Sequence, residues 1–449
     1  MGAVAARHPY IEALLNGCEA PRGGASWLDE RRAHALERAN ALTVPTTRDE
    51  EWRFTDVSPL TRVPFRPVAA PARLSPGDIA RFVVPEAPAR LVFVDGVFEP
   101  ALSASAGLPD GVVVSSLGAA LAKHAAEIEP HLARHAAFEH EVFAALNTVY
   151  LRDGAFVLVP RNVRCAAPVQ VLHVSTQKGA AAYPRCLVVA GAGAALTLIE
   201  DYAGLGDAVY FNDAVTEFVV GEGAHVRQVR IQRESPGAFH IATCAAAVAK
   251  DARFDSHAMT FGARLSRLNL DVVQHGEGAA VGLDGLAFLS GRQLADSHTL
   301  MDHAQPRGRC QQLHKCVVAD AAHAVFNGKI LVRPGAQLTD SSQQSRNLLL
   351  SDKARVDTKP QLEIFADDVK CAHGATVGQL DPEQLFYLRS RGLPVQRARN
   401  LLIYAFAAQV IDRIPVPSLV KALEEAVLAE TQAPTQPSPL PKGMIEEGR

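Results

Sequence analysis

Short apolar runs alternate with small or polar turns along the stretch from residue 314 to residue 388. Each run is too short for a helix and suits a strand. The runs are Val325–Phe326, Lys329–Val332, Leu348–Leu350 and Gln361–Phe365, and the turns are Ala319–Ala322, Arg333–Ala336, Ser351–Ala354 and Ala366–Asp368. The pattern predicts successive β-strands joined by tight turns, followed by a helix that begins at Asp381–Pro382.

The same alternation extends upstream to about residue 153, where it acquires a regular period. Gly/Ala-rich turns recur, and their last alanines are Ala194, Ala224, Ala252 and Ala279. Successive alanines are spaced by 30, 28 and 27 residues. A period of this size, built from strands without helices, is typical of a solenoid. In a parallel β-helix each strand pairs with the coils on either side, so no helical crossovers are needed. At about 28 residues per coil, residues 153–373 predict about eight coils.

Structured regions are expected on both sides of the repeat. Residues 1–152 combine helical patterns with one hairpin signal, in which Asp95–Gly96 separates two apolar runs. Residues 377–432 predict three helices, and residues 433–449, with four prolines among polar residues, predict a disordered tail. The fold class is therefore mainly β, with a parallel β-helix over residues 153–376. A β-sandwich is the alternative, but the hairpin turns that it needs are nearly absent from the repeat.

Composition narrows the possible functions. The chain has 449 residues, of which 48% are hydrophobic and 21% charged, with a net charge of −3. This balance gives no reason to expect nucleic-acid binding or capture by an anionic membrane. No apolar run approaches the roughly 20 residues of a membrane span, and the first residues lack a signal-peptide pattern. Seven cysteines lie scattered without a CxxC pair, which favours a cytoplasmic protein with reduced thiols.

Common catalytic and nucleotide-binding motifs are missing. There is no GxxxxGK[ST] motif, because Asn327–Gly328–Lys329 lacks the upstream glycine and precedes Ile330. No GxGxxG follows a strand, and neither GxSxG nor HExxH occurs. We therefore expect a chain that binds no nucleotide itself and is not an enzyme.

Two Cys/His groups are candidate ligand sites. Cys310, His314 and Cys316 share one face of an extended strand, which is compatible with a soft-metal site. The alternative is that they fill the interior of a coil as small hydrophobic groups. Cys371 and His373 lie on the expected last coil, and Gly374 suggests that the chain turns there and presents the imidazole outward. Two ligands cannot complete a four-coordinate shell, so a cluster there needs ligands from a partner chain.

Several motifs together resemble the SufD family of the SUF iron–sulfur cluster assembly system. The resemblance covers nearly the whole chain and is most specific from about residue 326 to residue 391. It implies a right-handed parallel β-helix flanked by helical regions. The motifs are Glu51–Thr55, Ala145–Asn147, Asp153–Gly154, Gly328–Ile330, Ala336–Asp340, Gln344–Ser351, Lys359–Ile364 and Asp367–Asp381.

The resemblance also implies partners and ligands. Such proteins work as scaffold subunits with the paralogue SufB and the ATPase SufC. The paralogue carries a cysteine in the strand that corresponds to Gln344–Leu348, and this chain has none there. His373 becomes the candidate ligand of a transient Fe–S cluster at the SufB interface, with Cys371 beside it. SufB would bind the strands of residues 326–373, and SufC the helices of residues 381–430.

Three further possibilities stay open at this stage. The isolated chain could form a homodimer through the surface that SufB would use, because the paralogues would be alike there. The chain could instead be a β-helix carbohydrate-active enzyme, which would need clustered carboxylates on one face of the solenoid. It could also be a purely structural subunit in which His373 and Cys371 have no ligand role.

Overall fold

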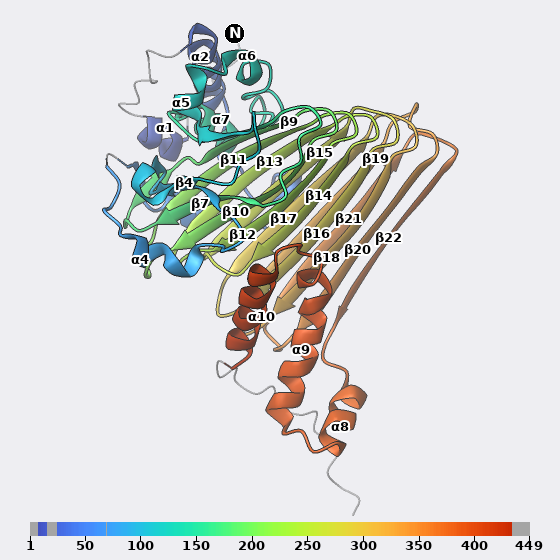
Figure 1. Cartoon of the computed structure of the whole chain (residues 1–449). Coiled ribbons are helices and arrows are strands. Elements are labelled where there is room, and N and C mark those ends of the chain that lie inside the picture. The colour runs from blue at the N-terminus through green and yellow to red at the C-terminus, as the bar shows by residue number, and fades with distance from the viewer. Residues whose placement is uncertain (1–7, 16–24, 69, 433–449) are drawn as a thin grey trace, which may run out of the picture.

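The computed structural model describes residues 8–15, 25–68 and 70–432, so the expected tail of residues 433–449 lies outside them. Most of this part of the chain forms a flattened parallel β-solenoid of two facing sheets (Figure 1). Each coil contributes one long strand to each sheet, and eight coils follow one another. The predicted class and the predicted number of coils are therefore confirmed.

The strands of the first sheet are β6 (Ala155–Val159), β9 (Arg185–Ala190), β11 (Phe211–Val220), β13 (Phe239–Val248), β15 (Leu265–Gln274), β17 (Leu294–His303), β19 (His323–Val332) and β21 (Arg355–Ile364). Those of the second sheet are β7 (Val169–Ser175), β10 (Ala195–Gly204), β12 (His225–Arg233), β14 (Arg253–Thr260), β16 (Ala280–Leu289), β18 (Arg309–Val318), β20 (Thr339–Leu349) and β22 (Val369–Gly378). Short strands join them at the N-terminal end: β1 (Arg66–Pro67), β2 (Ala89–Val94), β3 (Val97–Phe98), β4 (Ala104–Ser105), β5 (Val113–Ser116) and β8 (Ala180–Ala182).

The helices lie outside the solenoid. Those before it are α1 (Pro9–Leu15), α2 (Ser26–Ala41), α3 (Ser58–Thr61), α4 (Pro76–Ile79), α5 (Leu117–Leu121), α6 (Ala125–Ile128) and α7 (Val142–Val149), with 3₁₀ turns η1 (Glu50–Trp52), η2 (Ala80–Phe82) and η3 (Pro100–Leu102). Those after it are α8 (Pro382–Ser390), α9 (Val395–Ile411) and α10 (Pro417–Gln432).

The spacing of the periodic alanines in the sequence equals the length of one coil, so successive alanines lie one above the other in the solenoid. His225 and Arg253 donate their backbone N–H groups to the carbonyls of Ala194 and Ala224, so these alanines occupy equivalent turn positions. All four of the periodic alanines are buried in one core between the sheets. Facing sheets about 10 Å apart leave room mainly for small and branched side chains. This explains why a chain rich in Ala and Val can fill so long a core.

The predicted hairpin is also confirmed, and it closes the N-terminal end of the second sheet. Strand β2 pairs with β3 antiparallel across Asp95–Gly96, both with positive φ. On its other side β2 pairs in parallel with β7, so the first coil does not end in an unpaired edge.

The N-terminal region packs on the outer face of the first sheet. Trp52, the aromatic residue of the Glu51–Thr55 motif, is buried there, and the Arg267 guanidinium lies 3.8 Å from its ring centroid. The Thr55 hydroxyl donates to Asp296 at 2.6 Å, and Arg267 donates to the same carboxylate at 2.7 Å. Burial alone would raise the pKa of Asp296, but Arg267 and His298 outweigh it and lower that pKa to about 2. The motif therefore anchors its segment to the solenoid.

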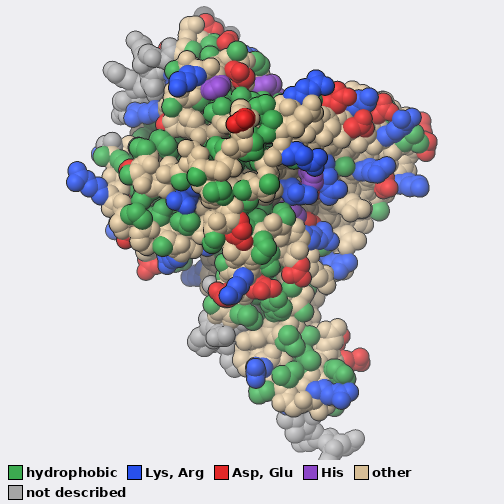
Figure 2. Space-filling view, in the orientation of Figure 1, with side chains coloured by type: hydrophobic (Ala, Val, Ile, Leu, Met, Phe, Trp, Pro, Cys, Tyr) green, Lys and Arg blue, Asp and Glu red, His purple; other side chains and the backbone are tan. Residues whose placement is uncertain are grey.

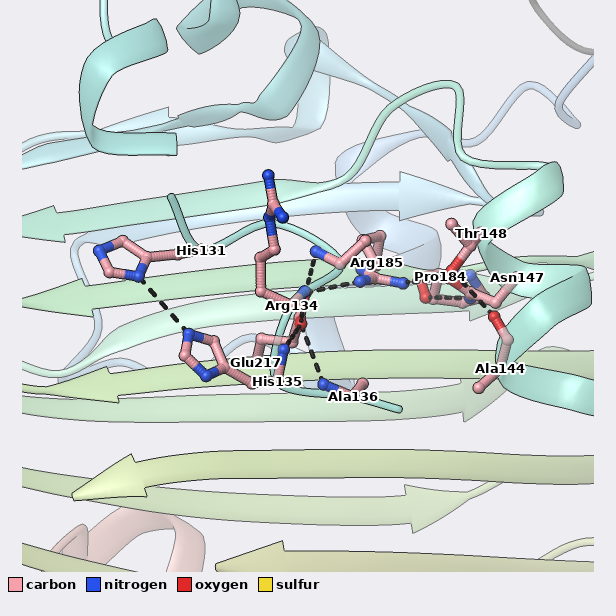
Figure 3. A network of polar contacts seen from close by, with 11 residues as sticks. His131, Arg134, His135, Ala136, Ala144, Asn147, Thr148, Pro184, Arg185 and Glu217 are labelled. Atoms are coloured by element: carbon pink, nitrogen blue, oxygen red, sulfur yellow. Dashed lines mark hydrogen bonds and ion pairs between the residues drawn. The ribbon is translucent and has the colours of Figure 1, made fainter. Parts of the chain in front are cut away.

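A second anchor is the carboxylate of Glu217, shown in Figure 3. It is fully buried on β11 and accepts hydrogen bonds from the backbone N–H groups of residues 133–136, at 2.8 to 3.1 Å. Arg185 forms an ion pair with the same carboxylate and also donates to Asn147 of α7. Burial would raise the pKa of Glu217, but Arg185 and these backbone groups outweigh it, so the pKa lies below 4.5. One buried charge thus holds the loop before α7 against the sheet.

The C-terminal helices pack on the opposite side, on the outer face of the second sheet. Apolar residues of α9 and α10 join those of β12, β16 and β18 in one core, and α8 lies furthest from the solenoid (Figure 1). Lys315 of β18, almost fully buried, donates to the carbonyl of Phe406 at 2.8 Å and to Gln409 at 2.6 Å. Within the described ranges, no helix combines the length and the apolar character that a membrane span requires.

The anchor at Glu217 gives a first prediction. The change Glu217→Gln leaves the Arg185 charge buried without its partner, so we expect a loss of about 3 kcal/mol in the free energy of unfolding. Because the pKa of Glu217 is lowered, its contribution is complete above pH 4.5 and is lost as the pH falls through the folded-state value. The difference between wild type and variant, measured by urea unfolding, should therefore narrow below pH 4.5.

The matched control is Glu222→Gln, at an exposed turn that follows the same strand. It should change the free energy of unfolding by less than about 0.5 kcal/mol. Equal effects of the two substitutions would contradict the assigned role of Glu217.

Candidate functional site: the open end of the solenoid

The last coil has no further coil to pair with among the described residues. Strand β22 pairs with β20, strand β21 pairs with β19, and both are the outermost strands of their sheets. In the interior of a sheet the backbone groups of both edges are bonded, whereas an outermost strand presents one unpaired edge. Strand β22 is exposed along most of its length, and β21 is half-buried. The solenoid therefore ends in an open layer, opposite its first coil (Figure 1), and Lys359 of β21 forms an ion pair there with Glu50 of the N-terminal region.

His373 and Cys371 lie on β22, in this open layer. Cys371 packs against the core between the sheets. Side chains alternate between the two faces of a strand, so His373 lies on the same interior side two residues further on. Its register partner, Gln343 on β20, is buried. His373 is nevertheless exposed, because no coil covers it.

The expected turn after His373 is wrong. Strand β22 continues through Gly374 to Gly378, and the helix α8 begins only at Pro382. The imidazole therefore does not reach the surface by turning out of the solenoid. It is accessible through the open end, from the direction in which a further coil would lie.

Cys371 is half-buried, and its thiol is held in the protonated form. Burial raises the pKa of the Cys371 thiol, and the carboxylate of Asp340 raises it further. Metal binding requires the thiolate, so a cation at this position would have to displace the proton. This makes Cys371 a weaker ligand than an ordinary exposed cysteine. His373, in contrast, is exposed.

The two side chains could hold iron only in part. Successive residues of a strand rise about 3.3 Å, so residues two apart are close enough for long side chains to converge on one ion. Within the described ranges, however, no group of three or more His, Cys, Asp or Glu side chains is placed to hold a metal ion. Two donors fit an iron–sulfur cluster only if another chain supplies the remaining ligands.

Cys310, His314 and Cys316 do not form a metal site. They share the interior face of β18, but four residues along a strand span about 13 Å, which is too far for Cys310 and His314 to reach one ion. The ring of His314 stacks on Phe326 at 4.5 Å, and burial lowers its pKa to about 4. Burial also raises the pKa of both thiols to about 12. The alternative reading is therefore correct: all three fill the core.

The interior of β20, directly behind the terminal strand, is polar, which the sequence reasoning missed. Its buried inward residues are Thr339, Ser341, Gln343, Ser345 and Asn347. Two coils earlier, the equivalent positions of β16 include Val281, Leu283 and Ala287. The signal was present in Thr339–Asn347, a run of nine polar residues inside a strand. The layer directly behind the terminal strand is therefore polar, as is part of the interior of earlier coils, where Gln228, Arg230 and Gln232 of β12 are buried.

Apolar residues also remain exposed at and beside this end. They include Leu338, Ile364, Phe365 and Val377 around the last coil. On the C-terminal helices, Tyr387, Leu388, Leu401 and Ala405 line a groove of about 600 Å³. Figure 2 shows charged side chains gathered over the C-terminal coils and apolar ones over the projecting helices.

These features define a class of protein: a parallel β-solenoid whose open end displays a thiol and an imidazole and which carries a helical appendage near that end. Residues 173–406 match the family described as "SUF system FeS cluster assembly, SufBD core domain". Residues 20–171 match the SufBD protein N-terminal region. The chain therefore belongs to the SufBD family of iron–sulfur cluster assembly proteins.

Curated relatives agree with this assignment over almost the whole chain. An iron–sulfur cluster assembly SufBD family protein of Synechocystis is 40% identical, covering 94% of each chain. The iron–sulfur cluster assembly protein SufD of Escherichia coli is 35% identical over 84% of this chain and 87% of its own. SufD of Bacillus subtilis is 30% identical over 90% of this chain and 93% of its own. The resemblance to SufD found from the motifs is confirmed.

Proposed function

We propose that the chain is a non-enzymatic scaffold subunit that pairs with a SufB-like paralogue and a SufC-like ATPase, and that it holds a transient Fe–S cluster at the interface with the paralogue. The observation that carries this proposal is the position of His373 and Cys371 on the last strand of an open solenoid end. The cluster is cargo, assembled there and passed on. In this proposal the chain works in the cytoplasm, where its cysteines stay reduced.

The domain limits inferred from the sequence fit this division of labour and remain part of the proposal. Residues 1–152 close one end of the solenoid, residues 153–376 carry the ligands, and residues 377–432 bind the ATPase.

The ligand pair suits a cluster that must leave again. His ligation raises the reduction potential of an Fe–S cluster relative to all-thiolate ligation. The raised pKa of Cys371 weakens the one thiol available on this side. Because this chain offers two donors at most, separation of the two chains would remove half of a four-ligand set. Release can therefore follow from a movement of the interface.

His373 gives the central test of this proposal. The variant His373→Ala should leave folding and complex assembly unchanged, because an exposed side chain contributes within about 0.5 kcal/mol to stability. It should strongly reduce the iron content and the cluster absorbance of the complex purified with the paralogue and the ATPase. Cys371→Ala should have the smaller effect, because the resemblance to SufD assigns the ligand role first to His373. Iron assay and visible absorption of each purified complex are the measurements.

The control is Lys370→Ala, an exposed position on the same strand with the side chain on the opposite face. It should retain normal iron. Normal iron loading in His373→Ala would remove His373 from the site and favour the purely structural alternative. A melting temperature lowered enough to explain the loss would also refute a ligand role.

The interface with the paralogue is proposed to be the open layer of β21 and β22. Unpaired strand edges beside exposed apolar side chains favour pairing with another chain. Ile364, Phe365 and Val377 lie exposed around this layer, with Phe365 at 62% exposure. If the paralogue presents the same layer, the contact has two-fold character, and this chain alone could form a homodimer through it.

A charge placed in this layer should prevent association. We expect Val377→Lys to abolish binding of the paralogue and to leave the isolated chain monomeric, because the ammonium group would be buried without a partner. Light scattering coupled to size-exclusion chromatography measures both. The control is Val97→Lys, on the exposed hairpin at the opposite end. Paralogue binding that survives Val377→Lys would place the interface elsewhere.

The ATPase is proposed to bind the projecting helices. Phe386 of α8 is 72% exposed and Tyr387 is 57% exposed, which is unusual for adjacent aromatic residues. Aromatic residues of this kind often anchor protein interfaces. They lie beside the groove between α8 and α9, so a helix or loop of the ATPase has a recess to occupy.

Loss of this surface should abolish ATPase binding, and Phe386→Asp tests this without removing the core that α9 and α10 share with the second sheet. A chain truncated after Gln379 and the single variant Phe386→Asp should both fail to co-purify with the ATPase, whereas Val97→Asp should behave like wild type. Binding is measured by pull-down with the ATPase and by calorimetric titration of each variant with the ATPase. Circular dichroism checks the fold. The truncated chain co-purifying as well as the full chain would refute this part of the proposal.

A further inference from the structure

A ladder of buried side-chain amides runs through the solenoid core towards His373. Gln343 on β20 is only 1% exposed, and its Nε2 donates to the Oε1 of Gln312 at 2.8 Å. Gln312 on β18 in turn donates its Nε2 to the Thr299 hydroxyl at 2.7 Å. Gln343 thus directs its N–H group towards the preceding coil, and Gln312 directs its own across the core to the facing strand β17. The Gln343 N–H group therefore points away from the open end of the solenoid. The free acceptor of the ladder, Gln343 Oε1, lies at the end nearest to the last coil.

The carbonyl oxygen at that end has no partner. Gln343 Oε1 is buried and accepts no hydrogen bond in the structure. A buried acceptor without a donor is unfavourable, so such a group calls for an explanation. Since Nε2 is occupied towards the preceding coil, Oε1 remains available to the following one. The residue of the following coil that is paired with Gln343 is His373.

The opposite sheet leaves space for this amide. Gly328 on β19 faces Gln343, and a Cβ atom at that position would lie 2.0 Å from Gln343 Nε2 and 2.6 Å from its Cδ. A side chain at residue 328 would therefore displace the amide from the ladder. This gives a structural reason for the glycine of the Asn327–Gly328–Lys329 segment, which no nucleotide site explains.

We propose that Gln343 is a positioning residue for His373: its Oε1 accepts a hydrogen bond from one ring N–H, which leaves the other ring nitrogen free to bind iron. Metal-binding histidines usually donate their second ring nitrogen to such an acceptor, which fixes tautomer and orientation. Adjacent strands lie about 4.8 Å apart, so a side-chain rotation brings the exposed imidazole to this oxygen without backbone movement. This inference rests on the proposed ligand role of His373.

The first test needs no iron. In the isolated chain labelled with ¹⁵N-histidine, at about pH 8.5 where imidazole is neutral, long-range ¹H–¹⁵N spectra report the tautomer of each ring. His373 is assigned by the signal lost in His373→Ala. One tautomer should dominate in wild type and in Gln343→Glu, which keeps an acceptor. Gln343→Leu should shift His373 to the mixture of a free imidazole. Identical tautomer populations in wild type and Gln343→Leu would overturn the inference.

The second test measures iron. In the complex with the paralogue, Gln343→Leu should weaken iron retention about 10-fold, the lower end of the usual effect of such positioning groups. Gln344→Leu is the matched control, because this neighbouring amide is exposed on the opposite face and should not matter. Gln343→Met, closer in shape, replaces Gln343→Leu if the latter lowers the melting temperature.

The outcomes separate this inference from the proposed function. Iron lost in His373→Ala but retained in both Gln343 variants would overturn the positioning role alone. Iron retained in His373→Ala would overturn the proposed function, while the tautomer spectra would still decide whether Gln343 and His373 are bonded.

Discussion

The structure depends on backbone pairing between successive coils. Each strand of a parallel solenoid needs a neighbour on both edges, and the chain supplies these neighbours one coil at a time. At the N-terminal end the β2–β3 hairpin and β5 take the place of further coils. At the C-terminal end, no described strand pairs beyond β21 and β22. The free edges therefore gather in one layer, and the half-buried Cys371 and the exposed His373 lie in that layer.

A polar interior suits the layer directly behind this open end. An apolar interior would leave a hydrophobic end exposed to water, whereas a polar layer at β20 can face either water or another chain. Polar side chains in a core must be bonded, and several here are not: Gln343 Oε1, Asn347 Oδ1 and Thr358 Oγ1 are buried without a described partner. All three belong to the last two coils. Buried polar atoms without a described partner also occur in earlier coils, on His173 and Arg230 for example, but those of β20 and β21 lie next to the open layer.

Much of the fold could be predicted from the sequence, because its signals are local and repeated. Alanines at a period near 28 residues and the Asp95–Gly96 turn report backbone geometry directly. Two kinds of feature could not be read in this way. Strand length was underestimated at β19, where Asn327–Gly328 looks like a break but continues the strand, since the facing amide of Gln343 occupies the space of a side chain. The exposure of His373 on the last coil was anticipated, but not its cause, because a glycine after the histidine suggested a turn where strand β22 in fact continues.

The position of Lys315 links the two proposed binding surfaces. Its ammonium is bonded to Phe406 and Gln409 of α9, and burial, followed by Arg346 and Arg413, lowers its pKa to about 8. Breaking these bonds would leave a buried polar group without partners, so α9 and β18 should move together. Strand β18 pairs with β20, and β20 pairs with β22. A force applied to the helices by a bound ATPase would therefore reach the strand of His373 through two rigid ladders, without any contact between the ATPase and the cluster.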